Sequence, residues 1–137
     1  MEKFRFLEQT GDLKFEAWGS SQRELFENAA LALFSGMFNI EGFEAEEWAG
    51  IQVSAESDDE LLKKFLDELL FRFSTEGNIF MEFKVSTMDH SLTAECGFIR
   101  YDNERHECMA EIKAVTYHDL LVENNEGLWH CVVVCDI

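Results

Sequence analysis

Basic residues are scarce in this sequence: 11 lysines and arginines stand against 28 aspartates and glutamates, which gives a net charge of −17. Binding to a nucleic-acid phosphate backbone needs clustered lysine and arginine side chains, so we expect no direct nucleic-acid binding. A strongly negative charge instead favours cations and basic protein surfaces as partners. Solubility in a charged cytoplasm is the other explanation, and it accounts for much of the excess.

Long apolar runs are also missing. No segment approaches the length of a membrane-spanning helix. Met1-Glu2-Lys3 leads directly into an alternating pattern, without the apolar core of a signal peptide. We therefore expect a cytoplasmic protein that does not associate with membranes. Proline is absent, which agrees with compact, regular elements.

Cysteine is too infrequent for a disulfide framework in a chain of 137 residues. Cys131 and Cys135 lie in one apolar run at a spacing that puts both on one face of a strand. With His106 or His118 they can form a zinc site, but there is no Cys-x-x-Cys pair. Reduced cysteines in the core are the favoured interpretation. The other cysteines are Cys96 and Cys108.

Sequence motifs of nucleotide binding and hydrolysis are absent. The 8 glycines are scattered and never form a phosphate-binding loop. Neither a Gly-x-Ser-x-Gly nor a His-Glu-x-x-His motif is present. A Ser-His-Asp triad is unsupported rather than excluded, because its geometry cannot be read from a sequence.

The residues that are present suit one globular domain over residues 1–137, since 47% are hydrophobic and 13 are phenylalanine. Apolar residues recur every three to four positions over 25–37 and 61–73, which predicts two amphipathic helices. Ser21 and Ser57 each stand three residues before a glutamate, the capping box that begins a helix. Gly77 indicates where the second helix ends.

Apolar alternation predicts strands in the rest of the chain. Turn-forming residues at 89–91 and 124–127 indicate hairpins, whose strands pair antiparallel. The expected fold class is α+β, with one or more antiparallel sheets and the two main amphipathic helices packed on one face. The expected strands cover 13–17, 51–55, 80–85, 92–96, 120–123 and 128–135.

The final apolar run leads into Asp136 and Ile137, so the Asp136 side chain and the chain-end carboxylate of Ile137 lie at the tip of one expected strand. Oxygen ligands of this kind suit calcium, magnesium or manganese. Asp12, in a short turn between two expected strands, is a further acidic candidate. The alternatives are a solvated Asp136 at a surface strand end and an ordinary turn aspartate at Asp12.

Lys113 stands in residues 111–118, a segment with neither a clean strand pattern nor a clean helix pattern. A lysine among small apolar residues either points to water or pairs with a buried carboxylate. Upstream, residues 100–106 form a polar loop rich in turn formers. Because basic residues are few, Arg105 and Lys113 on one loop and strand unit are candidate functional side chains.

Several segments, taken in order along the chain, resemble the archease family. Residues 111–118 read E-I-K-A-V-T-Y-H, which resembles the family signature. Each match alone is weak, but together and at family spacing they are specific. The others are Thr10 with Asp12, F-E-N-A-A-L at 26–31, L-D-E-L-L at 66–70, T-E-G at 75–77, Y-D and R-H at 101–106, and D-I at 136–137.

Archeases are small acidic proteins that activate the RtcB-type RNA ligase, which becomes guanylylated on a histidine with GTP and divalent metal. The resemblance implies a protein cofactor, not an enzyme, that promotes ligase guanylylation and multiple turnover in tRNA splicing and RNA repair. Association with tRNA would be indirect, through the ligase. The resemblance also implies a divalent cation, calcium before magnesium or manganese, bound by Asp12, Asp136 and the carboxylate of Ile137. Lys113, Asp12 and Asp136 would be needed for ligase activation.

Two departures from the family pattern bear on these roles. The family usually has His before Thr and Ala before Asp at the first motif, where this chain has Gln9 and Gly11. A direct role for that histidine is therefore not expected here. An Asp-Trp pair is common in the second helix, where this chain has Lys64 and Phe65. If that aspartate contacts metal or ligase elsewhere, Lys64 puts the contact in doubt.

Electrostatics agrees with a cation at the strand tip. Two carboxylates about 4 Å apart repel by roughly 4 kcal/mol at an effective dielectric constant near 20. Either one of them holds a proton or a cation lies between them, and we expect the cation. Two other function classes stay open. One is an acidic chaperone-like module for basic clients, and the other, less favoured, is a metal-dependent hydrolase.

Overall fold

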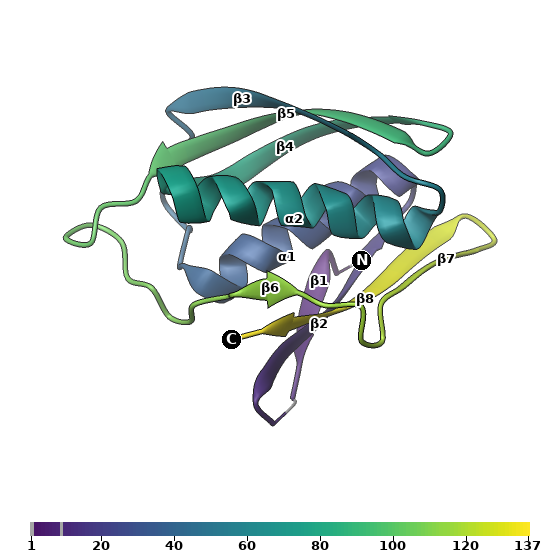
Figure 1. Cartoon of the computed structure of the whole chain (residues 1–137), viewed down its shortest axis with the longest axis horizontal. Helices are drawn as coiled ribbons and strands as arrows, with labels where there is room; N and C mark the ends of the chain where they lie inside the picture. The colour runs from purple at the N-terminus through teal and green to yellow at the C-terminus, as the bar shows by residue number, and fades with distance from the viewer. Residues whose placement is uncertain (1, 9) are drawn as a thin grey trace.

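The computed structural model describes residues 2–8 and 10–137 and contains two helices and eight strands in those residues (Figure 1). In chain order they are β1 (Phe4–Leu7), β2 (Asp12–Gly19), α1 (Gln22–Met37), β3 (Glu47–Ser54), α2 (Asp58–Glu76), β4 (Asn78–Met88), β5 (Ser91–Arg100), β6 (Ala114–Val115), β7 (Leu121–Asn125) and β8 (Leu128–Asp136).

The strands form two antiparallel sheets, with the helices between them (Figure 1). The larger sheet has the order β1-β2-β8-β6, with β7 also paired to β8, and the smaller has the order β3-β5-β4. Helix α1 contacts β2 of the larger sheet and β4 of the smaller, and α2 likewise contacts strands of both. Each sheet therefore has the helices on one face, which confirms the predicted α+β class. That two sheets share one helical layer is not specified by the sequence pattern.

Both helices begin at the predicted serines. The hydroxyl of Ser21 accepts a hydrogen bond from the Glu24 amide, and that of Ser57 from the Glu60 amide, each at 3.2 Å. Helix α2 ends before Gly77, whose φ of 75° is the left-handed conformation that glycine favours. Neither helix has the length and apolar character of a membrane span.

The core lies between the sheets and includes three of the four cysteines. Cys96, Cys131 and Cys135 are fully buried, which confirms core cysteines at these positions and a shared face for the last two. Burial is the main cause that raises the pKa of each of these thiols to about 12. Cys108 is exposed, so the core interpretation is wrong there, because it lies in an irregular segment outside the core.

Helix carboxylates cover two strand edges. Glu27 of α1 accepts a hydrogen bond from the Val85 amide of β4 at 2.9 Å, and Asp59 of α2 accepts one from the Val122 amide of β7 at 2.8 Å. A strand edge otherwise presents unpaired amides that can template pairing with another chain. Part of the acidic composition is therefore used inside the fold.

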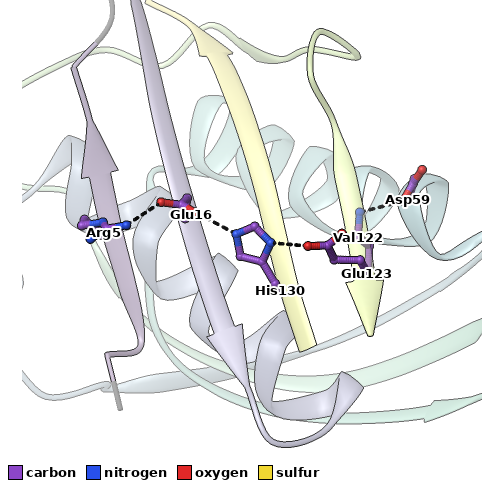
Figure 2. A network of polar contacts seen from close by, with 6 residues as sticks. All are labelled: Arg5, Glu16, Asp59, Val122, Glu123 and His130. Atoms are coloured by element: carbon purple, nitrogen blue, oxygen red, sulfur yellow. Dashed lines mark hydrogen bonds and ion pairs between the residues drawn. The ribbon is translucent and has the colours of Figure 1, made fainter. Parts of the chain in front are cut away.

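A row of charged side chains crosses four strands of the larger sheet (Figure 2). Arg5 of β1 donates to Glu16 of β2 at 2.9 Å, and the two ring nitrogens of His130 lie 2.8 Å from Glu16 and 3.0 Å from Glu123. Ionised carboxylates only accept hydrogen bonds, so both histidine contacts are hydrogen bonds only when both ring nitrogens carry protons. The His130 ring also stacks on Trp18, with centroids 5.5 Å apart.

The pKa of Glu16 lies below its ordinary value of 4.5. The hydrogen bond from Arg5 is the largest cause, burial opposes it, and the hydrogen bond from His130 adds to it. A carboxylate with a lowered pKa stabilises the fold above its unfolded-state pKa, and this contribution is lost as the pH falls through the folded-state value.

We expect native protein to react with iodoacetamide at one cysteine only, Cys108, because the thiolate is the reactive form and the other thiols are buried. Intact-mass spectrometry should find one adduct before unfolding and four after it. A Cys108→Ser variant should remain unmodified until it is unfolded. Adducts at Cys131 or Cys135 in the native state would contradict the core described above.

We expect Glu16→Gln to lower the free energy of unfolding at neutral pH. The difference in this free energy between wild type and variant should become smaller as the pH falls below 4.5. Urea unfolding of both proteins across this range measures the gap. Glu82→Gln is the matched control, since Glu82 is exposed on β4 and makes no ion pair with the residues described. A gap that stays constant at acidic pH would show that Glu16 acts through packing instead of charge.

Candidate functional site

The structure brings Asp12 and Asp136 together at one end of the larger sheet. Asp12 begins β2, Asp136 ends β8, and the two are directly opposite in the antiparallel register. Side chains of opposed residues project from the same face, with Cβ atoms typically 4.5–5.5 Å apart. Asp12 is half-buried and Asp136 is exposed, and Ile137, 44% exposed, follows directly.

The donors at this point fit a hard cation. Two carboxylates on opposed strands supply oxygen ligands, which calcium and magnesium prefer, and their exposure leaves room for water and further oxygen donors. Within residues 2–8 and 10–137, no group of three or more His, Cys, Asp or Glu side chains is arranged to hold a metal ion. A cation here would therefore depend on the aspartate pair with oxygens from the end of the chain, and its binding stays a prediction.

The electrostatic environment of Cys135 shows which carboxylates gather near this strand end. After burial, the charges of Asp136, Asp67 and Asp12 are the causes that raise the pKa of the Cys135 thiol. Asp67 belongs to α2 and pairs with Lys63 at 2.8 Å. The sequence analysis did not assign Asp67 to the site, although it lies within one of the family-like segments.

Lys113 lies next to the aspartate pair through its backbone. Its amide donates a hydrogen bond to the Asp136 carbonyl at 2.8 Å, and the following residue, Ala114, is the β6 partner of Asp136. The Lys113 side chain is exposed and makes no ion pair with the described part of the chain. Of the two alternatives, the lysine that points to water is the one observed.

The residues that depart from the family pattern occupy different positions relative to this site. Gln9 is outside the described residues. Gly11 has a φ of +84°, a left-handed conformation that strains any side chain, so glycine suits this turn. Lys64 donates to the Ser54 carbonyl at 3.0 Å, at the end of a strand of the smaller sheet. Lys64 thus contacts the opposite sheet from Asp136.

The polar loop at 100–106 is held by its own hydrogen bonds. The Asp102 amide donates to Nδ1 of His106 at 2.9 Å, and the Asp102 carbonyl accepts from the amides of Arg105 and His106. His106 is 7% exposed, and Arg105 lies over the Phe43 ring at 5.9 Å. Arg105 and Lys113 line different surface hollows, so the structure does not bring these two bases together.

Comparison with known proteins extends over nearly the whole chain. Residues 4–137 match the model of the archease protein family. The chain is 36% identical to the protein archease of Methanosarcina mazei over 99% of its own length and 97% of the relative. It is 34% identical to the protein archease of Pyrococcus abyssi, with the full length of both chains covered.

Solved structures give the same result. The solution structure of Methanobacterium thermoautotrophicum protein 1598 has a TM-score of 0.83 and 35% sequence identity, with both chains fully covered. The crystal structure of a Thermotoga maritima archease, described as a possible chaperone, has a TM-score of 0.70 at 24% identity, covers 96% of this chain and 94% of its own, and supports the fold alone. By the match of its sequence and of its fold, this chain belongs to the archease family.

Proposed function

We propose that this protein is a non-enzymatic cofactor that activates an RtcB-type RNA ligase in tRNA splicing and RNA repair. It would promote guanylylation of the ligase and allow repeated turnover, and it would meet tRNA only through the ligase. Family membership and the opposition of Asp12 and Asp136 across β2 and β8 support the proposal. The strongly acidic composition fits a basic protein partner and argues against direct binding to RNA.

The aspartate pair is the part of the site that we assign to a divalent cation, calcium before magnesium or manganese. Asp12, Asp136 and the carboxylate of Ile137 would hold the ion, which supplies positive charge between groups that otherwise repel. These carboxylates lie at the end of the β2–β8 pair, and the exposed Asp136 is within reach of a partner. At the ligase, they would deliver or reposition a cation near the bound nucleotide.

The backbone and the side chain of Lys113 have separate roles in this proposal. Its amide holds the end of β8 through the Asp136 carbonyl, so the side chain is not needed to keep Asp136 in place. The exposed ammonium group is then available to offset a phosphate or a carboxylate of the ligase complex. Loss of the side chain alone would therefore affect activation without displacing Asp136.

A chaperone-like binding module is the second candidate. It is favoured by the acidic composition, which suits basic clients. Such a module would suppress aggregation of unrelated basic proteins, and Asp136 would not matter. The two functions therefore differ in their dependence on a single side chain.

We expect calcium to bind wild-type protein and not Asp136→Asn, because the variant keeps the shape of the side chain but loses its charge. Isothermal titration measures binding, and thermal unfolding measures stabilisation, which is about 2.7 kcal/mol at a hundredfold excess over Kd. Without divalent cations, Asp136→Asn should melt no lower than wild type, since it removes a charge opposite Asp12.

Asp89→Asn is the matched control for this titration. It removes the same charge at the β4–β5 hairpin of the smaller sheet, and asparagine tolerates the positive φ of Asp89. Unchanged calcium binding by Asp136→Asn would remove the aspartate pair from the metal site. Magnesium and manganese titrations would rank the ions.

We expect multiple-turnover ligation by the cognate ligase to rise when wild-type protein is added, and Asp136→Ala and Lys113→Ala to reduce the stimulation at least roughly tenfold, equivalent to about 1.4 kcal/mol. Lys84→Ala is the control, since Lys84 is exposed on the smaller sheet and lies over the Trp48 ring. Full stimulation by both variants would discard the assigned site. No stimulation by wild type, with suppressed aggregation of an unrelated protein, would favour the chaperone-like module.

A further inference from the structure

A groove of about 400 Å³ runs between α2 and the segment at 111–114. Leu70 and Phe71 of α2 and Ile112 of the segment give it an apolar floor, and Asp67, Glu111 and Lys113 line it with charge. Ile112 is buried, whereas Phe71 is 61% exposed. Aromatic side chains, phenylalanine included, are enriched in the buried centres of protein–protein interfaces.

The groove continues toward the candidate cation site. Lys113 lines the groove, and its amide donates a hydrogen bond to the Asp136 carbonyl. Asp67, on the α2 side, acts on the same buried thiol, that of Cys135, as Asp136 and Asp12 do. Lys113 therefore belongs both to the groove and to the segment that holds the end of β8.

A second exposed aromatic side chain, Tyr117 of the segment at 111–117, lies against the same face of α2, nearer the start of the helix. Tyr117 is 63% exposed, donates its hydroxyl to Glu60 at 3.0 Å and lies 4.5 Å beneath the Lys63 ammonium group. Glu60, Lys63, Asp67 and Phe71 recur at helical spacing, so they form one stripe. The stripe and the 111–117 segment make a continuous face that carries aromatic and acidic groups.

Charge indicates what kind of partner would cover this face. Asp67 is already paired with Lys63, but Glu111 is exposed and makes no ion pair with the described residues. A second copy of this chain would bring another net charge of −17 to the interface, which opposes self-association. The net charge favours a basic partner, whose apolar side chain would cover the floor and whose basic side chain would pair with Glu111, while Lys113 would face an acidic group of the same partner.

We propose that this groove docks a basic, partly apolar segment of the ligase, an inference that rests on the proposed function. An apolar side chain of the segment packs on Phe71 and Leu70, and an arginine or lysine of the segment pairs with Glu111. Docking here places the ligase beside Asp136. The groove thus contributes affinity for the ligase, and Asp136 at the end of β8 is the group that activates it.

The test is the affinity of the full chain for the cognate ligase, measured by fluorescence anisotropy at low and high salt. Phe71→Ala should weaken binding at least tenfold at both salt concentrations, because it removes apolar contact. Glu111→Gln should weaken binding mainly at low salt, because salt screens an exposed ion pair. Met88→Ala is the control, since Met88 is 77% exposed on the smaller sheet. Calcium titration of each variant should match wild type, which shows that the fold and the cation site are intact.

The outcomes separate this proposal from the one on which it rests. If wild type stimulates the ligase, but Phe71→Ala and Glu111→Gln bind it with unchanged affinity, the groove is not the docking surface and the proposed function stands. If wild type neither binds nor stimulates the ligase, both proposals are wrong. If sedimentation shows wild-type dimers that Phe71→Ala dissociates, a second copy covers the groove, and the ligase-docking assignment is overturned.

Discussion

The register in which β8 pairs with β2 is the constraint on which the core and the candidate site both depend. It places Phe15 opposite Val133 and Ala17 opposite Cys131, all buried, and in the same ladder it places Asp12 opposite Asp136. A slip of one residue would turn the buried side chains toward solvent and separate the two aspartates. The apolar contacts that fix the register therefore hold two like charges in opposition, which the carboxylates alone would not favour.

Several acidic side chains stabilise the fold through hydrogen bonds, in addition to those that face solvent. Glu27 and Asp59 accept strand amides, Glu60 accepts a tyrosine hydroxyl, and Glu16 joins two cationic side chains across the larger sheet. Each of these carboxylates has its charge offset by donors from another element. Part of the acidic composition is therefore used to join elements of the fold, whereas Asp136 and Glu111 are exposed.

Local patterns predicted much of this fold, and long-range contacts account for what they missed. The serine caps, the apolar stripes and Gly77 are local signals, and the structure bears them out. The glutamates that follow these caps make other contacts: Glu24 accepts from the Ser20 amide, and Glu60 accepts from the Tyr117 hydroxyl of a distant segment. The short strand β6 has no local signature, since it forms where residues 114–115 pair with β8 and pack against α2. The approach of Asp12 to Asp136 could be expected from motifs but not from spacing.

The segment at 111–117 links the groove to the strand end with little structure of its own. Its ladder with β8 covers only Ala114 and Val115, and hydrogen bonds flank it on both sides, from the Lys113 amide to the Asp136 carbonyl at 2.8 Å and from the Thr116 amide to the Val134 carbonyl at 3.0 Å. A short ladder has few bonds to lose, and local opening of such a segment costs less than opening of the core. A partner that packs on Phe71 beside this segment would therefore act on the end of β8 through these few hydrogen bonds. Coupling of this kind would leave the β2–β8 register unchanged, and with it the opposition of Asp12 and Asp136 and the packing of the core.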